Sequence, residues 1–186
     1  QNAFLGYQGF IIDPLEENPN NTQYVSNVAD GRFNQEYSFF TRGYQGKYTL
    51  NLGTQVGDRI FLGMNLNTHS ILYDEFNFLR ESNSNNGSSV SLIGFENQLR
   101  VRGTGFSMQF GGIAKVTESF RVGLTYDTPT WYDISEETVQ YLETRRQQGP
   151  TTVTTVVDPR VINVFATYNL NSPGRWGLSA DYVFGS

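Results

Sequence analysis

The segment YQGKYTLNLG, residues 44–53, decides the fold class, because its side chains alternate between apolar and polar types. Apolar residues occupy positions 44, 48, 50 and 52, and polar residues occupy positions 45, 47, 49 and 51. Successive side chains of a β-strand point to opposite faces of the sheet. The segment is therefore predicted to be a strand with one apolar face and one polar face.

The same alternation recurs along the chain, in residues 60–67, 106–111, 121–127, 162–170 and 176–184. No residue in the apolar phase of these segments is charged. The phase continues across Pro173, so residues 161–185 are expected to form one strand that is kinked at this proline. The pattern predicts an all-β, antiparallel fold in which this chain supplies about five or six strands.

The predicted connections alternate between short and long. Residues 54–58 and 115–119 form short turns, whereas residues 79–93 and 135–160 have the polar composition of long loops. We expect one domain over residues 1–186, arranged as a loop (1–36), a hairpin (37–78), a second hairpin (94–135), a loop (136–160) and the kinked strand (161–185). An up-and-down arrangement then places the short turns on one side and the long loops on the other.

Such asymmetry is typical of outer-membrane β-barrels, which have short periplasmic turns and long extracellular loops. A membrane strand needs about 9–11 residues, and several predicted strands exceed the ~5–6 residues common in soluble proteins. We therefore predict an up-and-down transmembrane β-barrel whose apolar face contacts lipid, with glycines at 63, 111, 123 and 177 facing a crowded lumen. A soluble β-sandwich or lipocalin-like barrel, with its apolar face turned inward, is the alternative.

Aromatic residues support the membrane interpretation, because Tyr and Trp prefer the membrane–water boundary. They lie toward the predicted strand ends, at Tyr44, Tyr48, Trp131, Tyr132, Tyr182 and Phe184.

A short helix over residues 135–147 is expected inside the loop 136–160. Ser135 can cap it, acidic residues follow at 136 and 137, and basic residues stand at 145 and 146, as the helix dipole favours. Ile134 and Val139 occupy the positions of a hydrophobic staple, and a Gly-Pro pair at 149–150 ends the segment. The segment could instead fold locally against the barrel rim, and the helix could serve as a lid or as a partner-docking element.

Composition excludes several classes of function. The net charge is −5, the 13 Lys and Arg residues are scattered, and Cys is absent, which disfavours nucleic-acid binding, thiol catalysis and thiolate metal sites. His69 is the only histidine, and it falls in the polar phase of its strand without a Ser–Asp partnership or further zinc ligands. Residues 103–105 (Gly-Thr-Gly) lack the Lys-Ser/Thr of a phosphate loop.

The acidic residues are most simply solvated charges. Asp13, Glu16 and Glu17 lie in the first loop, and Asp74 and Glu75 lie near a strand end. They could bind a divalent cation loosely, although their spacing is not that of an EF-hand loop. The sequence therefore predicts no catalytic, cofactor-binding or metal-binding residues and a protein that is not an enzyme.

Two stretches resemble the FadL/TodX family of outer-membrane transport proteins. The first is GTGFSMQFGGI (103–113) with FRVGLTY (120–126) and TPTWYD (128–133), which resembles a strand pair of the family. The second is YNLNSPGRW (168–176) with ADYVFG (180–185), which resembles a later strand interrupted by proline. The opening AFLGYQGF (3–10) is similar to the branch found in Bacteroidota.

The resemblance implies a 14-stranded barrel in the bacterial outer membrane that moves hydrophobic compounds, such as long-chain fatty acids, and that needs no cofactor. It implies that this chain is the middle portion of the barrel, with the plug and the closing strands outside it. The expected partners are outer-membrane lipid, hydrophobic small molecules, and other outer-membrane proteins or lipoproteins. The alternative is a non-transporting FadL-like barrel that serves as a structural or accessory subunit of a larger secretion or assembly complex. No motif maps the residues of the family's ligand pocket onto this sequence.

Overall fold

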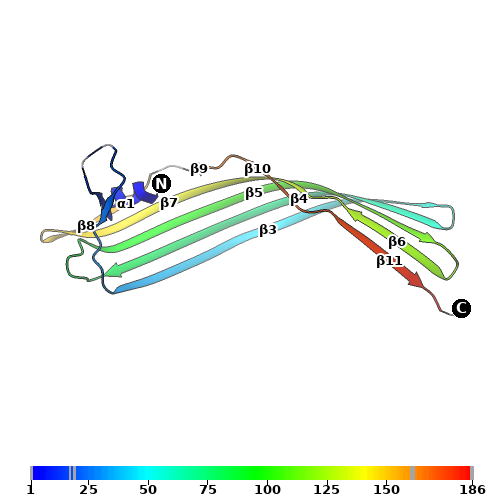
Figure 1. Ribbon diagram of the computed structural model, residues 1–186, viewed down its shortest axis with the longest axis horizontal. Coiled ribbons are helices and arrows are strands. Elements are labelled where there is room, and N and C mark those ends of the chain that lie inside the picture. Colours follow the sequence, from blue (N-terminus) through cyan, green and yellow to red (C-terminus); the bar gives the residue numbers. More distant parts are fainter. Residues whose placement is uncertain (1, 17, 19, 160–161, 185–186) are drawn as a thin grey trace. The chain divides into compact units, whose positions relative to one another are not determined.

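The computed structural model of the chain describes residues 2–16, 18, 20–159 and 162–184 (Figure 1). These residues form one helix, α1 (Asn2–Gln8), and a series of mostly long strands. The strands are β1 (Ile12–Pro14), β2 (Tyr24–Ser26), β3 (Phe33–Val56), β4 (Ile60–Asn83), β5 (Val90–Lys115), β6 (Phe120–Asp127), β7 (Trp131–Gln148), β8 (Thr151–Val157), β9 (Asn163–Val164), β10 (Tyr168–Asn171) and β11 (Arg175–Tyr182).

The strands of the described residues build one large sheet in the order β10-β7-β5-β4-β3. In addition, β6 pairs with β5 and β11, and β8 and β9 pair with β7. β10 and β7, β6 and β11, β5 and β6, and β7 with β8 and β9 pair antiparallel, and β1 and β2 form a small separate antiparallel sheet. The predicted all-β antiparallel fold is confirmed.

The chain divides into two compact units. Unit 1 comprises residues 1–42, 74–100 and 137–164, and unit 2 comprises residues 43–73, 101–136 and 165–186. The long strands β3, β4, β5 and β7 contribute residues to both units. Each unit is described by itself.

Unit 1 has a small core beside its N-terminal segment. Leu5 of α1 is buried, as are Val90, Leu92 and Leu142 of the sheet. The Thr144 hydroxyl donates a hydrogen bond of 2.7 Å to the Gly9 carbonyl. The Phe10 ring lies 3.6 Å from the Arg146 guanidinium, which is a cation–π contact. The predicted loop 1–36 is therefore partly wrong, because it contains α1 and the β1–β2 hairpin, and β3 starts within it.

The predicted helix over residues 135–147 is wrong, because these residues belong to β7. β7 pairs with β5 on one side. On its other side, residues 137–138 pair with β9 and residues 142–148 pair with β8, around a turn at Gly149 whose φ is 59°. β8 reads TTVTTVV, which is rich in β-branched residues that favour strands. Cap signals contribute only about 0.5–2 kcal/mol, so paired strands on both sides override them. The predicted loop 136–160 is likewise wrong.

The first predicted hairpin corresponds to β3 and β4, whereas the strand pairing differs from the prediction in the second. β3 and β4 form the first one, but they extend to residues 33 and 83 and so exceed the expected range 37–78. In place of the hairpin 94–135, β5 takes two successive partners, β6 and then β7. The predicted strand 161–185 is divided into β9, β10 and β11, with a break at residues 172–174 around Pro173. Residues 161 and 185 of that prediction lie outside the described residues.

Candidate functional site

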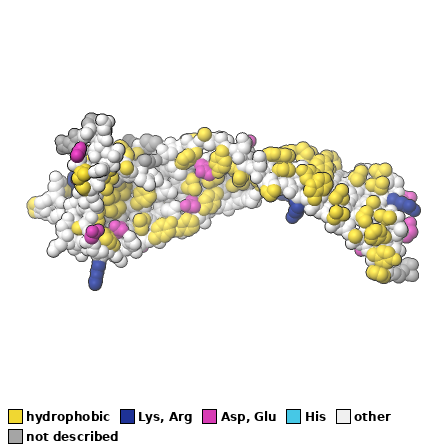
Figure 2. All heavy atoms as spheres, in the orientation of Figure 1, with side chains coloured by type: hydrophobic (Ala, Val, Ile, Leu, Met, Phe, Trp, Pro, Cys, Tyr) yellow, Lys and Arg dark blue, Asp and Glu magenta, His cyan; other side chains and the backbone are white. Residues whose placement is uncertain are grey.

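One face of unit 2 is apolar and exposed. Three neighbouring strands place Phe110, Tyr126 and Trp176 opposite one another, and Leu124 lies opposite Leu178. The Tyr126 and Trp176 rings stack with centroids 4.3 Å apart. Leu178 is 85% exposed and Trp176 is 67% exposed. Figure 2 shows hydrophobic side chains gathered over this part of the chain. These exposures mean that no described residue covers the face.

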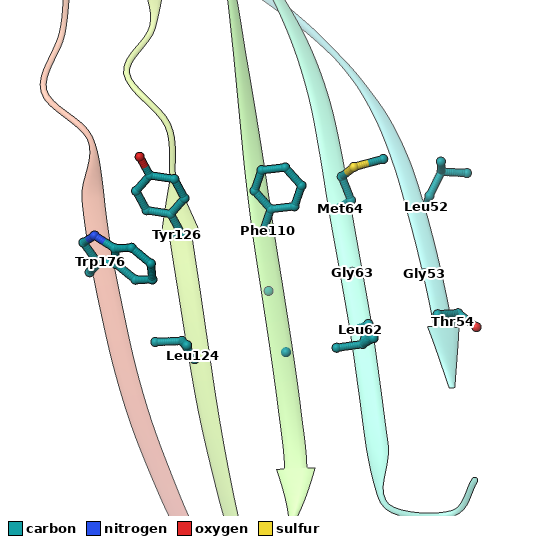
Figure 3. A pocket seen from close by; sticks show the side chains of 12 residues that line it. Leu52, Gly53, Thr54, Leu62, Gly63, Met64, Phe110, Leu124, Tyr126 and Trp176 are labelled. Atoms are coloured by element: carbon teal, nitrogen blue, oxygen red, sulfur yellow. The ribbon is translucent and has the colours of Figure 1, made fainter. Parts of the chain in front are cut away.

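A hollow of about 610 Å³ interrupts the apolar face at Gly112 of β5. Side chains of β5 itself and of the neighbouring strands surround it, as Figure 3 shows for Phe110 of β5, Leu62 of β4 and Leu124 of β6. Glycine has no side chain, so at this point the backbone of β5 is bare. The hollow is a local depression in a surface that is otherwise covered by large apolar side chains.

Aromatic rings lie at both ends of this face. At the end of β11, Tyr182 pairs with Phe120, and its ring lies 4.7 Å from that of Phe184. Toward the other end, Tyr48 and Trp131 are exposed. No charged residue occupies the even positions of β3 from 48 to 56, of β4 from 60 to 68, of β5 from 106 to 114, of β6, or of β11. Beyond this band, Arg102 and Asp133 lie together with Tyr44 and Leu72. The apolar phase of β3 is long enough for the about 9–11 residues that cross a bilayer.

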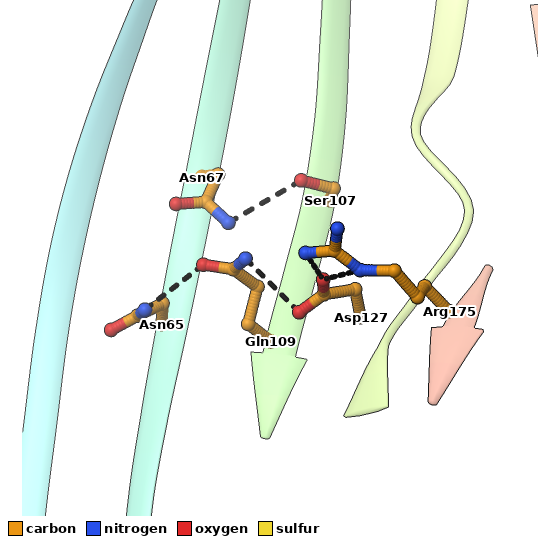
Figure 4. Close-up of polar contacts among 6 residues, drawn as sticks. All are labelled: Asn65, Asn67, Ser107, Gln109, Asp127 and Arg175. Atoms are coloured by element: carbon orange, nitrogen blue, oxygen red, sulfur yellow. Dashed lines mark hydrogen bonds and ion pairs between the residues drawn. The ribbon is translucent and has the colours of Figure 1, made fainter. Parts of the chain in front are cut away.

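The opposite face of unit 2 carries a row of polar side chains, here called the polar ladder: Asn51, Asn65, Gln109, Asp127 and Arg175, one from each of five strands. Figure 4 shows the four from Asn65 to Arg175. The Asn65 amide donates to the Gln109 carbonyl oxygen at 3.0 Å, and the Gln109 amide donates to Asp127 at 3.1 Å. Arg175 completes the row with an ion pair of 2.8 Å to Asp127. The ladder lines a polar hollow of about 340 Å³.

A second polar row lies beside the ladder. The Thr49 hydroxyl donates to the Asn67 carbonyl oxygen at 2.8 Å, and the Asn67 amide donates to the Ser107 hydroxyl at 3.3 Å. His69 Nε2 lies 2.9 Å from the same Ser107 hydroxyl, and the His69 ring packs edge-on against Tyr132. His69 thus lies on the polar face, as predicted, in a hydrogen-bonding role.

Glycines leave the backbone bare next to the ladder. Gly111 and Gly177 lie opposite Thr125, from either side. A Cβ on Gly63 would meet nothing closer than a carbonyl oxygen at 3.9 Å, so this position is open. Gly63 and Gly111 line the polar hollow. The glycines at 63, 111 and 177 therefore widen the space along the polar face.

A double irregularity interrupts β6–β7 and β10–β11 at the same level. Pro129 lies between β6 and β7, and Pro173 lies between β10 and β11. Proline has no N–H to donate, and side-chain hydroxyls here take over part of the backbone hydrogen bonding between the strands. The Thr128 hydroxyl accepts a hydrogen bond from the Met108 N–H at 2.9 Å, and the Ser172 hydroxyl accepts one from the Thr130 N–H at 3.0 Å.

The irregularity reverses the faces of the chain. Tyr132 contacts His69 and Gln45 of the polar face, and Leu170 lies opposite Tyr132. Leu170 therefore faces the polar side, although Trp176, with the same even parity, faces the apolar side. A one-residue shift moves each side chain to the other face. The expectation that the phase is kept across Pro173 is therefore wrong.

The reversal places an apolar patch on the polar face. The patch consists of Ile71, Tyr132, Ile134, Tyr168 and Leu170, and it surrounds Gly103 and Gly105. A Cβ on Gly103 would lie 2.7 Å from Ile134, and one on Gly105 would lie 2.5 Å from Tyr132, so only glycine leaves room for these side chains. Tyr168 and Leu170 are exposed.

The acidic residues singled out from the sequence do not gather into one site. Asp13 accepts a hydrogen bond of 2.8 Å from the Asn27 amide, and Glu16 is exposed. Asp74 forms ion pairs with Arg42 and Arg100, and Glu75 accepts a hydrogen bond from Asn77. Glu17 lies outside the described residues. Within the described ranges, no group of three or more His, Asp or Glu side chains is placed to hold a metal ion.

Sequence reasoning missed Gln109, Asp127 and Arg175 as members of one row. Their shared signal is position, since each occupies the polar phase of its strand, but only the register brings them together.

In the part of the chain that the structure describes, no helix is long and apolar enough to cross a membrane.

Comparison of the sequence with models of known protein families gives no match, and comparison with characterised proteins gives none either.

Proposed function

We propose that this chain forms part of the wall of an outer-membrane β-barrel that conducts hydrophobic compounds, such as long-chain fatty acids. The observation that carries the proposal is the uncharged apolar face of unit 2, which is exposed, long enough for a bilayer and bounded by aromatic rings. A charge at mid-depth on a lipid face costs about 2–4 kcal/mol, and the band of this face between residues 48 and 56 of β3 carries none. The resemblance to the FadL/TodX family supplies the substrate class and the 14-stranded architecture.

In this proposal the polar ladder faces the lumen. Its side chains satisfy one another across the strands, so the interior presents a hydrated surface whose charged members, Asp127 and Arg175, are paired with each other. The apolar patch around Gly103 and Gly105 offers the hydrophobic compound a dry contact on that otherwise polar face. Each buried methylene contributes about 0.8 kcal/mol, so an alkyl chain would move along such contacts by exchanging one apolar surface for another. No covalent step is required.

The two tryptophans of the chain allow a direct test of membrane insertion. Trp176 lies within the apolar face, and Trp131 lies toward its end. The protein would be inserted into phosphatidylcholine vesicles brominated at a shallow or a deep acyl position, as Trp131→Phe and Trp176→Phe variants. We expect Trp176 to be quenched best by deep bromines and Trp131 by shallow ones. If bromines quench neither tryptophan and aqueous acrylamide quenches both, the membrane proposal is excluded and a soluble β-sandwich is favoured.

Transport is tested separately. Uptake of a fluorescent long-chain fatty acid into vesicles that contain the full-length barrel should exceed that of empty vesicles. Replacement of Leu170 by Asp places a charge in the apolar patch and should slow the uptake. The control Ser179→Asp adds the same charge on the polar face outside the patch and should not. Equal uptake with and without protein would reject the transport role.

The second candidate is an accessory subunit of a larger envelope complex. It is favoured by the exposed apolar residues of the N-terminal segment in unit 1, which include Phe4, Tyr7 and Leu15. A barrel that binds no hydrophobic ligand and co-purifies with large envelope proteins, in a manner abolished by Phe4→Ser and Leu15→Ser, would support this role over transport.

A further inference from the structure

Four charged side chains of alternating sign cross unit 1, one from each of four strands. Arg42 of β3 lies 3.4 Å from Asp74 of β4, and Arg100 of β5 lies 3.3 Å from the same carboxylate. Glu137 of β7 lies 3.9 Å from Arg100. Each oxygen of Asp74 serves one guanidinium, since Arg42 contacts Oδ2 and Arg100 contacts Oδ1.

The two arginines keep most of their hydrogen-bonding capacity. A guanidinium has five N–H donors. Among the described residues, a carboxylate lies within 4.0 Å of one nitrogen of Arg42 and of two nitrogens of Arg100. The Asp74 side chain is 25% exposed, whereas those of Arg42 and Arg100 are 74% and 55% exposed. A molecule approaching from solvent therefore meets two guanidinium groups with the Asp74 carboxylate recessed between them, and the Glu137 carboxylate, 42% exposed, on the far side of Arg100.

The same residues, together with Glu75 and Gln98, line a hollow of about 310 Å³ whose remaining lining is apolar. Phe40, Phe76, Val139 and Ile162 belong to that apolar side, and Phe40 and Ile162 are exposed. A small inorganic anion would leave these side chains in water. A ligand that combines an anionic head with an apolar body would use both sides of the hollow.

We propose that Arg42 and Arg100, held by Asp74, form a clamp for the phosphate group of a membrane lipid, whose apolar part lies against Phe40 and Phe76. Two planar guanidinium groups match the oxygens of a phosphate by paired hydrogen bonds, which a lysine ammonium cannot reproduce. The proposal rests on the proposed membrane location, because only there is such a lipid abundant.

The test uses the full chain in detergent micelles and measures the binding of dioctanoyl phosphatidic acid by native mass spectrometry. We expect tighter binding of this lipid than of dioctanoyl phosphatidylcholine, whose phosphate is a diester with an attached cation. The variant Arg42→Gln/Arg100→Gln should bind phosphatidic acid about 30-fold more weakly. Each basic residue contributes roughly 1 kcal/mol to lipid binding, and about 1.4 kcal/mol corresponds to a tenfold change in affinity. Arg175→Gln, which removes an ion-paired arginine from the polar ladder, should leave the affinity unchanged.

A second variant separates a clamp from simple charge attraction. Arg42→Lys/Arg100→Lys keeps both charges, and we expect binding several-fold weaker than in the unmodified chain. Affinity equal to that of the unmodified chain would overturn the clamp. Inorganic phosphate that displaces the lipid at equimolar concentration would overturn the lipid assignment, as would equal binding of the two lipids. Tryptophan quenching in brominated vesicles reports membrane insertion independently, so failure of the clamp and failure of the barrel proposal are distinguishable.

Discussion

At the residue scale, single glycines decide how closely strands and side chains approach one another. A Cβ on Gly43 of β3 would overlap the carbonyl oxygen of Leu72 and lie 3.0 Å from the Tyr73 Cα, both of which are backbone atoms that cannot turn aside. Gly53, in the same strand, would meet only a carbonyl oxygen at 3.8 Å. A side chain would therefore clash with the neighbouring backbone at Gly43, whereas Gly53 has room for one.

This difference gives a prediction. Gly43→Ala should lower the free energy of unfolding by about 1–3 kcal/mol, the usual range for overpacking. Gly53→Ala should be neutral or stabilising by about 0.5–1 kcal/mol, because alanine costs less backbone entropy than glycine. Urea unfolding in detergent micelles, followed by tryptophan emission, measures both. Equal effects of the two substitutions would show that the close approach at Gly43 does not occur.

At the element scale, the paired irregularity at Pro129 and Pro173 determines which side chains lie on the apolar face and which lie on the polar face. Sequence parity groups Leu170 with Leu178, because both are even-numbered and apolar. The register separates them, since Leu170 lies opposite Tyr132 and Leu178 lies opposite Leu124. The cap-like signals around Ser135 fail for a related reason, because β5 on one side and β10, β9 and β8 on the other supply backbone partners that are distant in sequence.

The absence of cysteine from the chain makes this reversal testable by single-cysteine labelling. In vesicles, Leu170→Cys should react with a membrane-impermeant maleimide through the lumen, and Leu178→Cys should be protected by lipid. The neighbours provide matched controls, since Asn169→Cys should be protected more than Leu170→Cys, and Ser179→Cys should react more than Leu178→Cys. The same reactivity at positions 170 and 178 would mean that the phase is kept across Pro173.

At the scale of the whole molecule, the division of one sheet into an apolar and a polar face leads to the membrane proposal. Leu124 and Thr125 are neighbours in β6 and point to opposite faces: Leu124 lies beside the hollow at Gly112, and Thr125 lies beside Gly111 and Gly177. They have the same depth along the strand, so they differ chiefly in what they face.

We expect Leu124→Arg to destabilise the inserted barrel by about 2–4 kcal/mol, the cost of a cation at mid-depth on a lipid face. Thr125→Arg adds the same charge toward the polar hollow and should cost clearly less. The fraction folded into phosphatidylcholine vesicles, measured over a urea series, compares the two. A larger loss for Thr125→Arg would reverse the assignment of the faces and favour a soluble fold with its apolar face inward.

The sequence by itself determined the strand character, the two short turns and the uncharged apolar phase, because alternation with period two is a local property of the chain. It also placed His69 on the polar face by parity alone. The tertiary structure decided which strands pair, where the phase reverses, and which polar residues meet in one row. Asp127 and Arg175 are far apart in sequence and become partners only through the β6–β11 register. Pairing between distant strands satisfies backbone hydrogen bonds that no local signal specifies, so residues 135–147 become a strand in spite of their helix-like ends.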